Sequence, residues 1–398
     1  MFRLVTEPAR VTSERPAGAL PAIGRVVAAA LISFAIWRGA LFCFDLLGLS
    51  LTPNMGRCRK HWQVFGAGHE FLNGLFRWDS GWYLQIAERG YSFRPDKSSS
   101  VAFFPLFPLL SRYLGKLMGG HAVAGLVIAN VASVGAIAYL RLLGGALFGD
   151  RIGKLAVTLL LVFPTSLFLS AYYTEGLFLF CAIGAMYHYF RGQFVWCGCL
   201  GFFAMLTRST GIVLFGALAL DLGCQLYCKR QRFSWRMLWL LAMPVGLAVF
   251  PVYLHFKFGD AFAFAKTQEH WDRHASFPWT PVWDALWATN YAFPPDATKT
   301  QRFIDAGCVL GLVAAAACMA KQRYPVALWS YVLVGTVMPL TTYNIASMNR
   351  YVLSLFPIFL LLARLCQGRR ELERWILFAS GFFLAIYSLR FMQCGWAG

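Results

Sequence analysis

Charged residues are scarce in this chain of 398 residues. Asp, Glu, Lys and Arg together make up 14% of the sequence, and only 18 residues are acidic, whereas soluble domains carry about 25% charged residues. Hydrophobic residues make up 58%, and the apolar runs repeatedly reach the ~20 residues that a membrane-spanning helix needs. This composition excludes a soluble globular domain and predicts an all-α polytopic membrane protein.

Several motifs of nucleotide-binding proteins and hydrolases are absent from the sequence. There is no Walker loop, no Gly-x-Ser-x-Gly elbow and no Rossmann fingerprint. The Asp-x-Asp signature, by which soluble sugar transferases hold a metal and a nucleotide, is also missing. These absences disfavour a sugar donor that is linked to a nucleotide.

The sequence also lacks a complete metal site. Most of the eleven cysteines lie in apolar runs, and their spacing suits neither a zinc site nor a disulfide framework. His270 and His274 are four residues apart and could share a helical face around a metal, but no third ligand accompanies them, so a polar loop helix is favoured. No cofactor or metal ligand is assigned, although a role for a divalent metal stays open.

The formal net charge of +18 comes from basic residues that lie between the apolar runs. Such residues set membrane topology, so no nucleic-acid partner is expected. The short basic loops place the N-terminus inside, with residues 1–25 as a cytoplasmic N-terminal segment. Residues 26–398 are then a single transmembrane domain whose two long loops, 51–120 and 257–302, lie outside.

Hydropathy predicts a bundle of about eleven transmembrane helices. The two spans on either side of Arg208 are short and are separated only by the polar LTRSTG, so we expect a broken pair that meets at a site within the membrane. The predicted spans are 26–50, 121–143, 153–171, 175–190, 194–208, 210–227, 237–256, 303–320, 325–342, 350–366 and 375–393.

Two segments of the outer loops are predicted to form helices along the membrane surface. AFFPLFPLLSRYLGKLM, from Ala102, contains two prolines and two basic residues, so it suits an amphipathic surface helix better than a span. Trp279, Trp283 and Trp287 have a spacing of four, which places three indoles on one helical face. An interfacial anchor is the favoured role of these tryptophans.

The segment FRWDSGWYLQIAERGYSF in the first outer loop is the most specific candidate for chemistry. Asp79 stands beside Trp78, Trp82 and Tyr83, whose flat apolar faces suit stacking on sugar rings and exclude water. A carboxylate in such surroundings becomes a better base. The alternative is that Asp79 only caps a helix that stops at Gly90. The residues alone do not separate these two interpretations.

Glu175, Arg208 and Arg350 are charges that a bilayer penalises, so each needs a partner or a function. Both arginines fall at the predicted outer ends of their spans, where a lipid phosphate would lie. A guanidinium group matches phosphate oxygens in a bidentate fork. We therefore predict that Arg208 and Arg350 bind phosphate, the alternative being packing salt bridges with Glu175.

Six sequence blocks, in order from the first loop to near the C-terminus, carry a family resemblance. They are RWDSGWYLQIAERGY at Arg77, FFPLFPLL at Phe103, FPTSLFLSAYYTEGLF at Phe163, LTRSTGI at Leu206, FGDAFAFAKTQEHW at Phe258 and NRYVLSLFPIF at Asn349. With these blocks the chain resembles bacterial relatives of the PIG-V type GPI mannosyltransferases, which are integral-membrane glycosyltransferases of the GT-C class.

The resemblance implies a GT-C-like bundle and an inverting transferase that uses a polyprenyl-phosphate sugar, with mannose as the expected sugar. By the family pattern Asp79 is the catalytic residue, and the charged positions of the later motifs fall on Glu175, Arg208 and Arg350. The residues expected to bind sugar or acceptor are Trp78, Trp82, Tyr83, Glu175 and Trp271.

The resemblance also implies a place in the cell. The chain is short and its N-terminus is basic, as in bacterial members, so we expect a bacterial inner membrane with the active site facing the periplasm or exterior. The expected partners are the lipid-linked donor, a lipid or glycan acceptor of the cell envelope, and membrane lipids. A GPI acceptor is not expected.

A transporter or flippase of lipid-linked sugars is the main rival, because basic groups and a broken span also serve binding without chemistry. The long aromatic and acidic outer loop is the feature that a transporter does not require. A membrane scaffold without catalysis is a third interpretation, and it predicts that all charged residues in the membrane pair off.

Overall fold

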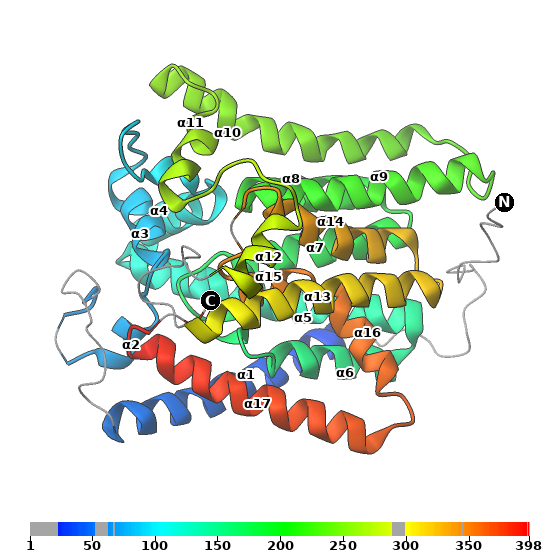
Figure 1. Ribbon diagram of the computed structural model, residues 1–398, viewed down its shortest axis with the longest axis horizontal. Helices are drawn as coiled ribbons and strands as arrows, with labels where there is room; N and C mark the ends of the chain where they lie inside the picture. Colours follow the sequence, from blue (N-terminus) through cyan, green and yellow to red (C-terminus); the bar gives the residue numbers. More distant parts are fainter. Residues whose placement is uncertain are drawn as a thin grey trace.

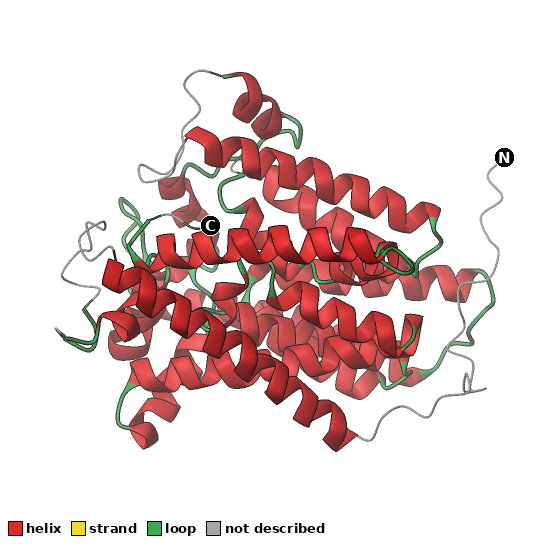
Figure 2. Ribbon diagram, turned by 90° about the horizontal axis from the view of Figure 1, so that it is seen from below, coloured by secondary structure: helices red, strands yellow, loops and turns green. Residues whose placement is uncertain are grey.

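A computed structural model describes residues 23–51, 63–66, 68–288, 299–343, 345–395 and 397. Figures 1 and 2 show that these residues form helices and loops, and that the described part of the chain contains no strand. The predicted all-α fold is therefore confirmed. Residues 1–22 of the predicted N-terminal segment lie outside the described residues, as do parts of both long loops.

The longer helices form the bundle, and short ones gather in the loops. The α-helices are α1 (Ile23–Leu51), α2 (Glu70–Gly74), α3 (Ser80–Arg89), α4 (Leu106–Met118), α5 (His121–Phe148), α6 (Asp150–Leu161), α7 (Glu175–Phe190), α8 (Phe194–Thr207), α9 (Ile212–Tyr227), α10 (Ala242–Phe258), α11 (Ala263–Lys266), α12 (Thr280–Trp287), α13 (Lys299–Lys321), α14 (Val326–Leu340), α15 (Met348–Ser354), α16 (Pro357–Leu365) and α17 (Arg370–Met392). The 3-10 helices are η2 (Ser100–Ala102), η3 (Ser166–Leu169), η4 (Ser209–Gly211), η5 (Trp235–Leu241) and η6 (Thr267–Trp271).

The predicted count of eleven spans is not confirmed. Six of the described helices are long and apolar enough to cross a membrane, or seven if α15 and α16, bent by 84° at their junction, form one broken span. The other predicted spans correspond to α6, α7, α8 and α14, which have only 12 to 16 residues. Hydropathy does not separate a short buried helix from a membrane span, because both are apolar.

Helix α7 lies at the centre of the bundle, and twelve of its sixteen residues are buried. It packs against α5 on one side and α8 on the other. The approach to α5 is close, because a Cβ at Gly176 would lie 2.7 Å from the carbonyl oxygen of Ala129. Glycine therefore lets the first turn of α7, which begins with Glu175, sit deep in the core.

The short helices α2, α3, α4 and α11 gather at one end of the bundle, on the left in Figure 1. The connections between α9 and α10 and between α16 and α17 lie at the other end. The sequence predicts that the left end faces outward. This grouping brings both long loops to the same end.

Helices form in both segments that the sequence predicts to lie along the membrane surface. Helix α4 buries Phe107 and Ser111 but exposes apolar residues, including Leu117, which is 83% exposed. On α12, Trp283 and Trp287 are exposed, as is Trp279 just before the helix. Exposed apolar faces of this kind suit the membrane interface.

One cysteine departs from the sequence expectation. Cys394, in the C-terminal segment, is disulfide-bonded. This segment lies beside the first outer loop, because Arg77 Nη2 donates to the carbonyl oxygen of Met392 at 3.0 Å. Disulfides persist outside the cytosol rather than within it, which agrees with the predicted outward orientation of this end.

Cysteine labelling tests the predicted topology. Ser98 is exposed in the first outer loop, and Arg230 is exposed in the connection between α9 and η5. On a background without exposed native cysteines, Ser98→Cys should react with a membrane-impermeant thiol reagent in intact cells. Arg230→Cys should react only after the membrane is opened. The reversed pattern would place the left end on the cytoplasmic side.

Candidate active site

Asp79 lies at the start of α3, which runs from Ser80 to Arg89 and stops at Gly90, as the sequence predicts. Gly90 has a φ of 82°, a conformation that glycine adopts readily. The Asp79 side chain makes no capping hydrogen bond to the helix. Capping is therefore not what this carboxylate does in the structure.

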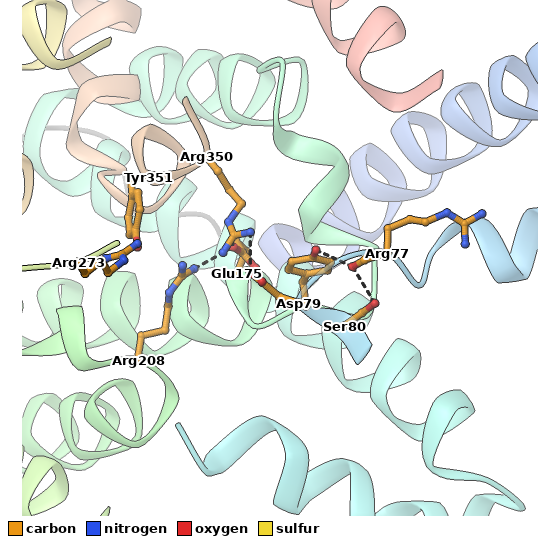
Figure 3. Close-up of polar contacts among 9 residues, drawn as sticks. Arg77, Asp79, Ser80, Glu175, Arg208, Arg273, Arg350 and Tyr351 are labelled. Atoms are coloured by element: carbon orange, nitrogen blue, oxygen red, sulfur yellow. Dashed lines mark hydrogen bonds and ion pairs between the residues drawn. The ribbon is translucent and has the colours of Figure 1, made fainter. Parts of the chain in front are cut away.

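The backbone just before Asp79 is tightly held. The carbonyl oxygen of Arg77 accepts hydrogen bonds from the Tyr173 hydroxyl at 2.7 Å and the Ser80 hydroxyl at 2.8 Å (Figure 3). Trp78 follows with a φ of 55°, which is rare for a bulky residue and costs free energy. These bonds hold the backbone in this unusual turn at the residue before Asp79.

The Arg77 side chain is an anchor rather than a ligand. It is buried, and this burial lowers the pKa of Arg77 to about 10, with weaker opposing effects of Glu70 and Tyr173. The guanidinium group is therefore still charged at neutral pH. It donates hydrogen bonds to the carbonyl oxygens of Phe76 and Met392. These bonds connect the turn before Asp79 to the end of α17.

Two acids and two arginines form a continuous ionic network, shown in Figure 3. Arg350 Nη1 lies 2.9 Å from Asp79 Oδ2, and Arg350 Nε lies 3.0 Å from Glu175 Oε1. Arg208 Nη1 donates a hydrogen bond to the same Glu175 oxygen at 2.9 Å. The sequence alternative of salt bridges with Glu175 is thus observed for both arginines. Asp79 joins the network through Arg350.

Breaks in regular structure deliver these side chains to one place. Glu175 is the first residue of α7, where the helix dipole favours an acid. Arg208 is extended, with φ −153° and ψ 142°, between α8 and η4, so the predicted break at LTRSTG is confirmed. Arg350 lies on α15, and Pro357 starts α16 after the 84° bend. The sequence reasoning did not foresee this second break.

Asp305 of α13 contacts the first turn of helix α15. Asp305 is fully buried, and its Oδ1 accepts the backbone N–H of Asn349 at 3.0 Å. A helix N-terminus leaves unpaired N–H groups, and here an acid from another helix satisfies one of them. Asp305 therefore helps to fix the residue that precedes Arg350. A lone acid within a predicted span was a signal that the sequence analysis did not use.

Exposure separates the two acids. The Asp79 side chain is 29% exposed, whereas that of Glu175 is 0% exposed. The side chains of Arg208 and Arg350 are only 11% and 10% exposed. Asp79 can therefore meet a substrate directly, while Glu175 is placed to hold the two arginines.

The predicted aromatic residues differ in exposure and in contacts. The Trp82 ring stacks on Phe103 at 5.8 Å and meets the edge of Trp271 at 6.1 Å, and all three are partly exposed. These rings form a platform next to the start of α3. Tyr83 is instead buried, which raises its pKa, and its ring packs against Phe103 and Phe107.

Trp78 contacts the C-terminal segment. Its Nε1 donates to the carbonyl oxygen of Gly395 at 3.4 Å. Of the residues predicted to bind sugar or acceptor, Trp82 and Trp271 are thus together, Trp78 contacts the C-terminal segment, and Glu175 is inside the ionic network.

Two residues of this region were missed by sequence reasoning. Arg273 Nη2 donates to the Tyr351 hydroxyl at 3.5 Å. The Tyr351 ring also lies 5.7 Å from the Arg208 guanidinium carbon. Tyr351 directly follows Arg350 in a block that carries the resemblance. Arg273 lies within HWDRH, where only the two histidines were considered as candidate ligands.

These histidines do not share a helical face. His270 contacts the carbonyl oxygen of Pro95 at 3.0 Å, whereas the His274 ring stacks on Tyr343. Over the described ranges, no group of three or more His, Cys, Asp or Glu residues could hold a metal ion. The two carboxylates of the network are already paired with arginines, which makes them a poor ligand set for a divalent ion.

The sequence profile described as Mannosyltransferase (PIG-V) matches residues 60–280, more than half of the 398 residues. The chain belongs to this family. The match covers Asp79, Glu175, Arg208 and Arg273. Arg350 and Asp305 lie beyond the matched range.

Similar proteins are known from mammals. The mouse protein GPI alpha-1,6-mannosyltransferase 2 is 34% identical over 198 residues, which cover 46% of this chain and 39% of the mouse protein. The human protein of that name is 31% identical over 212 residues, covering 49% of this chain and 41% of the human protein. The matched region thus spans about two fifths of the length of these relatives.

Solved structures with a similar arrangement share little sequence with this PIG-V family member. ArnT from Cupriavidus metallidurans bound to undecaprenyl phosphate has a TM-score of 0.49 and 16% identity, covering 84% of this chain and 60% of that chain. The oligosaccharyltransferase of Archaeoglobus fulgidus has a TM-score of 0.41 and 13% identity, covering 88% of this chain and 53% of that chain.

Proposed function

We propose that this chain is a glycosyltransferase that moves a sugar, mannose by its family, from a polyprenyl-phosphate donor to a hydroxyl group. The acceptor is a lipid-linked or cell-envelope molecule, and the reaction takes place on the non-cytoplasmic side with inversion at the anomeric carbon. The single observation that carries the proposal is a partly exposed Asp79 joined through Arg350 to a buried Glu175 and Arg208.

This arrangement supports a direct displacement. Asp79 accepts the proton of the acceptor hydroxyl as its oxygen attacks the anomeric carbon. The bond between that carbon and the phosphate oxygen breaks, and its electron pair leaves with the lipid phosphate. A single displacement inverts the configuration of the carbon. Arginines beside the phosphate stabilise the charge that develops there.

The aromatic platform supports a sugar or acceptor site. Trp82 and Trp271 present apolar ring surface next to the start of α3. Aromatic faces bury the apolar side of a sugar ring while leaving its hydroxyls free for hydrogen bonds. Glu175, which is fully buried, is assigned to the positioning of Arg208 and Arg350 rather than to contact with sugar.

A transfer assay tests the proposal. Purified protein, radiolabelled polyprenyl-phosphate mannose and a membrane lipid extract should give a labelled product whose mannose has the anomeric configuration opposite to that of the donor. The same protein in liposomes serves as the comparison with a transporter. Movement of intact donor across the liposome membrane, with no new labelled product, would replace the transferase by the flippase.

A further inference from the structure

Arg273 lies beside the ionic network but outside its ion pairs. It follows η6 in the second outer loop, and its contact with the Tyr351 hydroxyl, at 3.5 Å, is at the limit for a hydrogen bond. No carboxylate of the described residues forms an ion pair with Arg273. Figure 3 shows Arg273 and Tyr351 on the side of the network where Arg208 lies.

The charges of the ionic network and Arg273, taken together, do not cancel. Arg208, Arg350 and Arg273 contribute three positive charges, and Asp79 and Glu175 contribute two negative charges, which leaves one positive charge. Because the other two arginines are both paired with carboxylates, the excess resides on Arg273. An anion can bind Arg273 without displacing any carboxylate.

Binding an anion at Arg208 or Arg350 instead would disturb buried pairs. Both side chains are at least 89% buried, and both contact Glu175. Removing one partner of a buried ion pair leaves an uncompensated charge, which is strongly unfavourable. The arginine without a carboxylate partner is therefore the better first ligand for an incoming anion.

Tyr351 links Arg273 to the network. Its hydroxyl is the acceptor of the Arg273 contact, and its ring lies 5.7 Å from the Arg208 guanidinium carbon. An anion on Arg273 would thus sit next to Arg208, where charge that develops during a reaction is still stabilised. The neighbouring hydroxyl adds a hydrogen-bond donor once it turns toward an anion.

We propose that Arg273, with the Tyr351 hydroxyl, binds the phosphate of the lipid-linked sugar donor. This inference rests on the proposed function and deepens it by naming the arginine that meets the phosphate. A sugar phosphodiester carries one negative charge, equal and opposite to the excess on Arg273. When the bond to the sugar breaks, the electron pair stays on the phosphate and the acceptor proton passes to Asp79. The phosphate then gains negative charge beside Arg208.

The test compares Arg273→Ala with Arg94→Ala in the full-length protein. Arg94 is an exposed arginine of the first outer loop, so its variant controls for loss of one positive charge on the same face. Arg273→Ala should raise the KM for polyprenyl-phosphate mannose about ten- to a hundred-fold, as expected for one charge-assisted contact. Arg273→Lys should recover part of the loss, because it keeps the charge but not the fork. Arg94→Ala should leave KM unchanged.

A binding measurement separates this inference from the proposed function. Polyprenyl phosphate without sugar should raise the melting temperature of wild type in detergent, and Arg273→Ala should show no such rise although it melts normally by itself. A rise in wild type that Arg273→Ala loses, together with no sugar transfer by wild type, would keep the phosphate site and remove the transferase. Normal KM and a normal rise in Arg273→Ala would overturn the phosphate site and leave the transferase standing. An equal rise with inorganic phosphate would overturn a lipid-linked occupant.

Discussion

Asp79→Asn is expected to lower the rate of sugar transfer about 10²- to 10⁴-fold while the protein still folds and binds its donor. Asparagine has nearly the same volume as aspartate but does not act as a carboxylate base. The Asp79 side chain caps no helix, so α3 does not depend on it. Arg350 keeps Glu175 as a partner at 3.0 Å, so the network is not left with an isolated cation.

Transfer rates at saturating donor, melting temperature in detergent and binding of polyprenyl phosphate should be measured together for this variant. Asp96→Asn is the matched control, because it removes an exposed carboxylate from the same loop. The control should transfer sugar at the wild-type rate. A well-folded Asp79→Asn protein with near-normal transfer would show that Asp79 is not the base, and the transporter interpretation would gain support.

Glu175→Gln is expected to destabilise the protein by about 3–5 kcal/mol, the usual cost of leaving a buried charge without its partner. The Glu175 carboxylate has no exposed surface and is shared by Arg208 and Arg350. Without it, two nearly buried guanidinium groups share only the charge of Asp79. A large fall of melting temperature in detergent should follow.

A second substitution shows whether charge is the cause. Arg208→Gln added to Glu175→Gln removes one of the uncompensated cations, so the double variant should melt above Glu175→Gln alone, although transfer stays impaired. Glu88→Gln, at an exposed position on α3, is the matched control and should melt like wild type. If Glu175→Gln melted normally, or if the second substitution only added to the loss, the ionic network would not stabilise the bundle.

Local signals in the sequence were sufficient for several elements. Helix α3 ends at Gly90 because glycine readily adopts the positive φ required there. Helix α4 forms on a segment whose prolines and basic residues suit a surface helix. The break at Arg208 follows from a polar stretch between two apolar runs. Each of these outcomes depends on residues that are close together in the chain.

The count of membrane spans could not be obtained in this way. Helix α7 is as apolar as a span, but it has sixteen residues and is buried by α5 and α8. Whether an apolar helix faces lipid or other helices depends on the packing of the whole bundle. A hydropathy window measures composition only, so it treats both cases alike.

The sequence by itself determined the membrane class, the family resemblance and the identity of Asp79, Glu175, Arg208 and Arg350 as the charged residues of interest. The tertiary structure determined which of the two acids is accessible, since Asp79 is partly exposed and Glu175 is fully buried. It also brought Arg273 to Tyr351, 78 positions apart in the chain. Burial and ion pairing depend on contacts between distant segments, and the strength of a charge depends on both. For this reason composition and local spacing identified the charged groups, and only the packed bundle determined which positive charge stays unpaired.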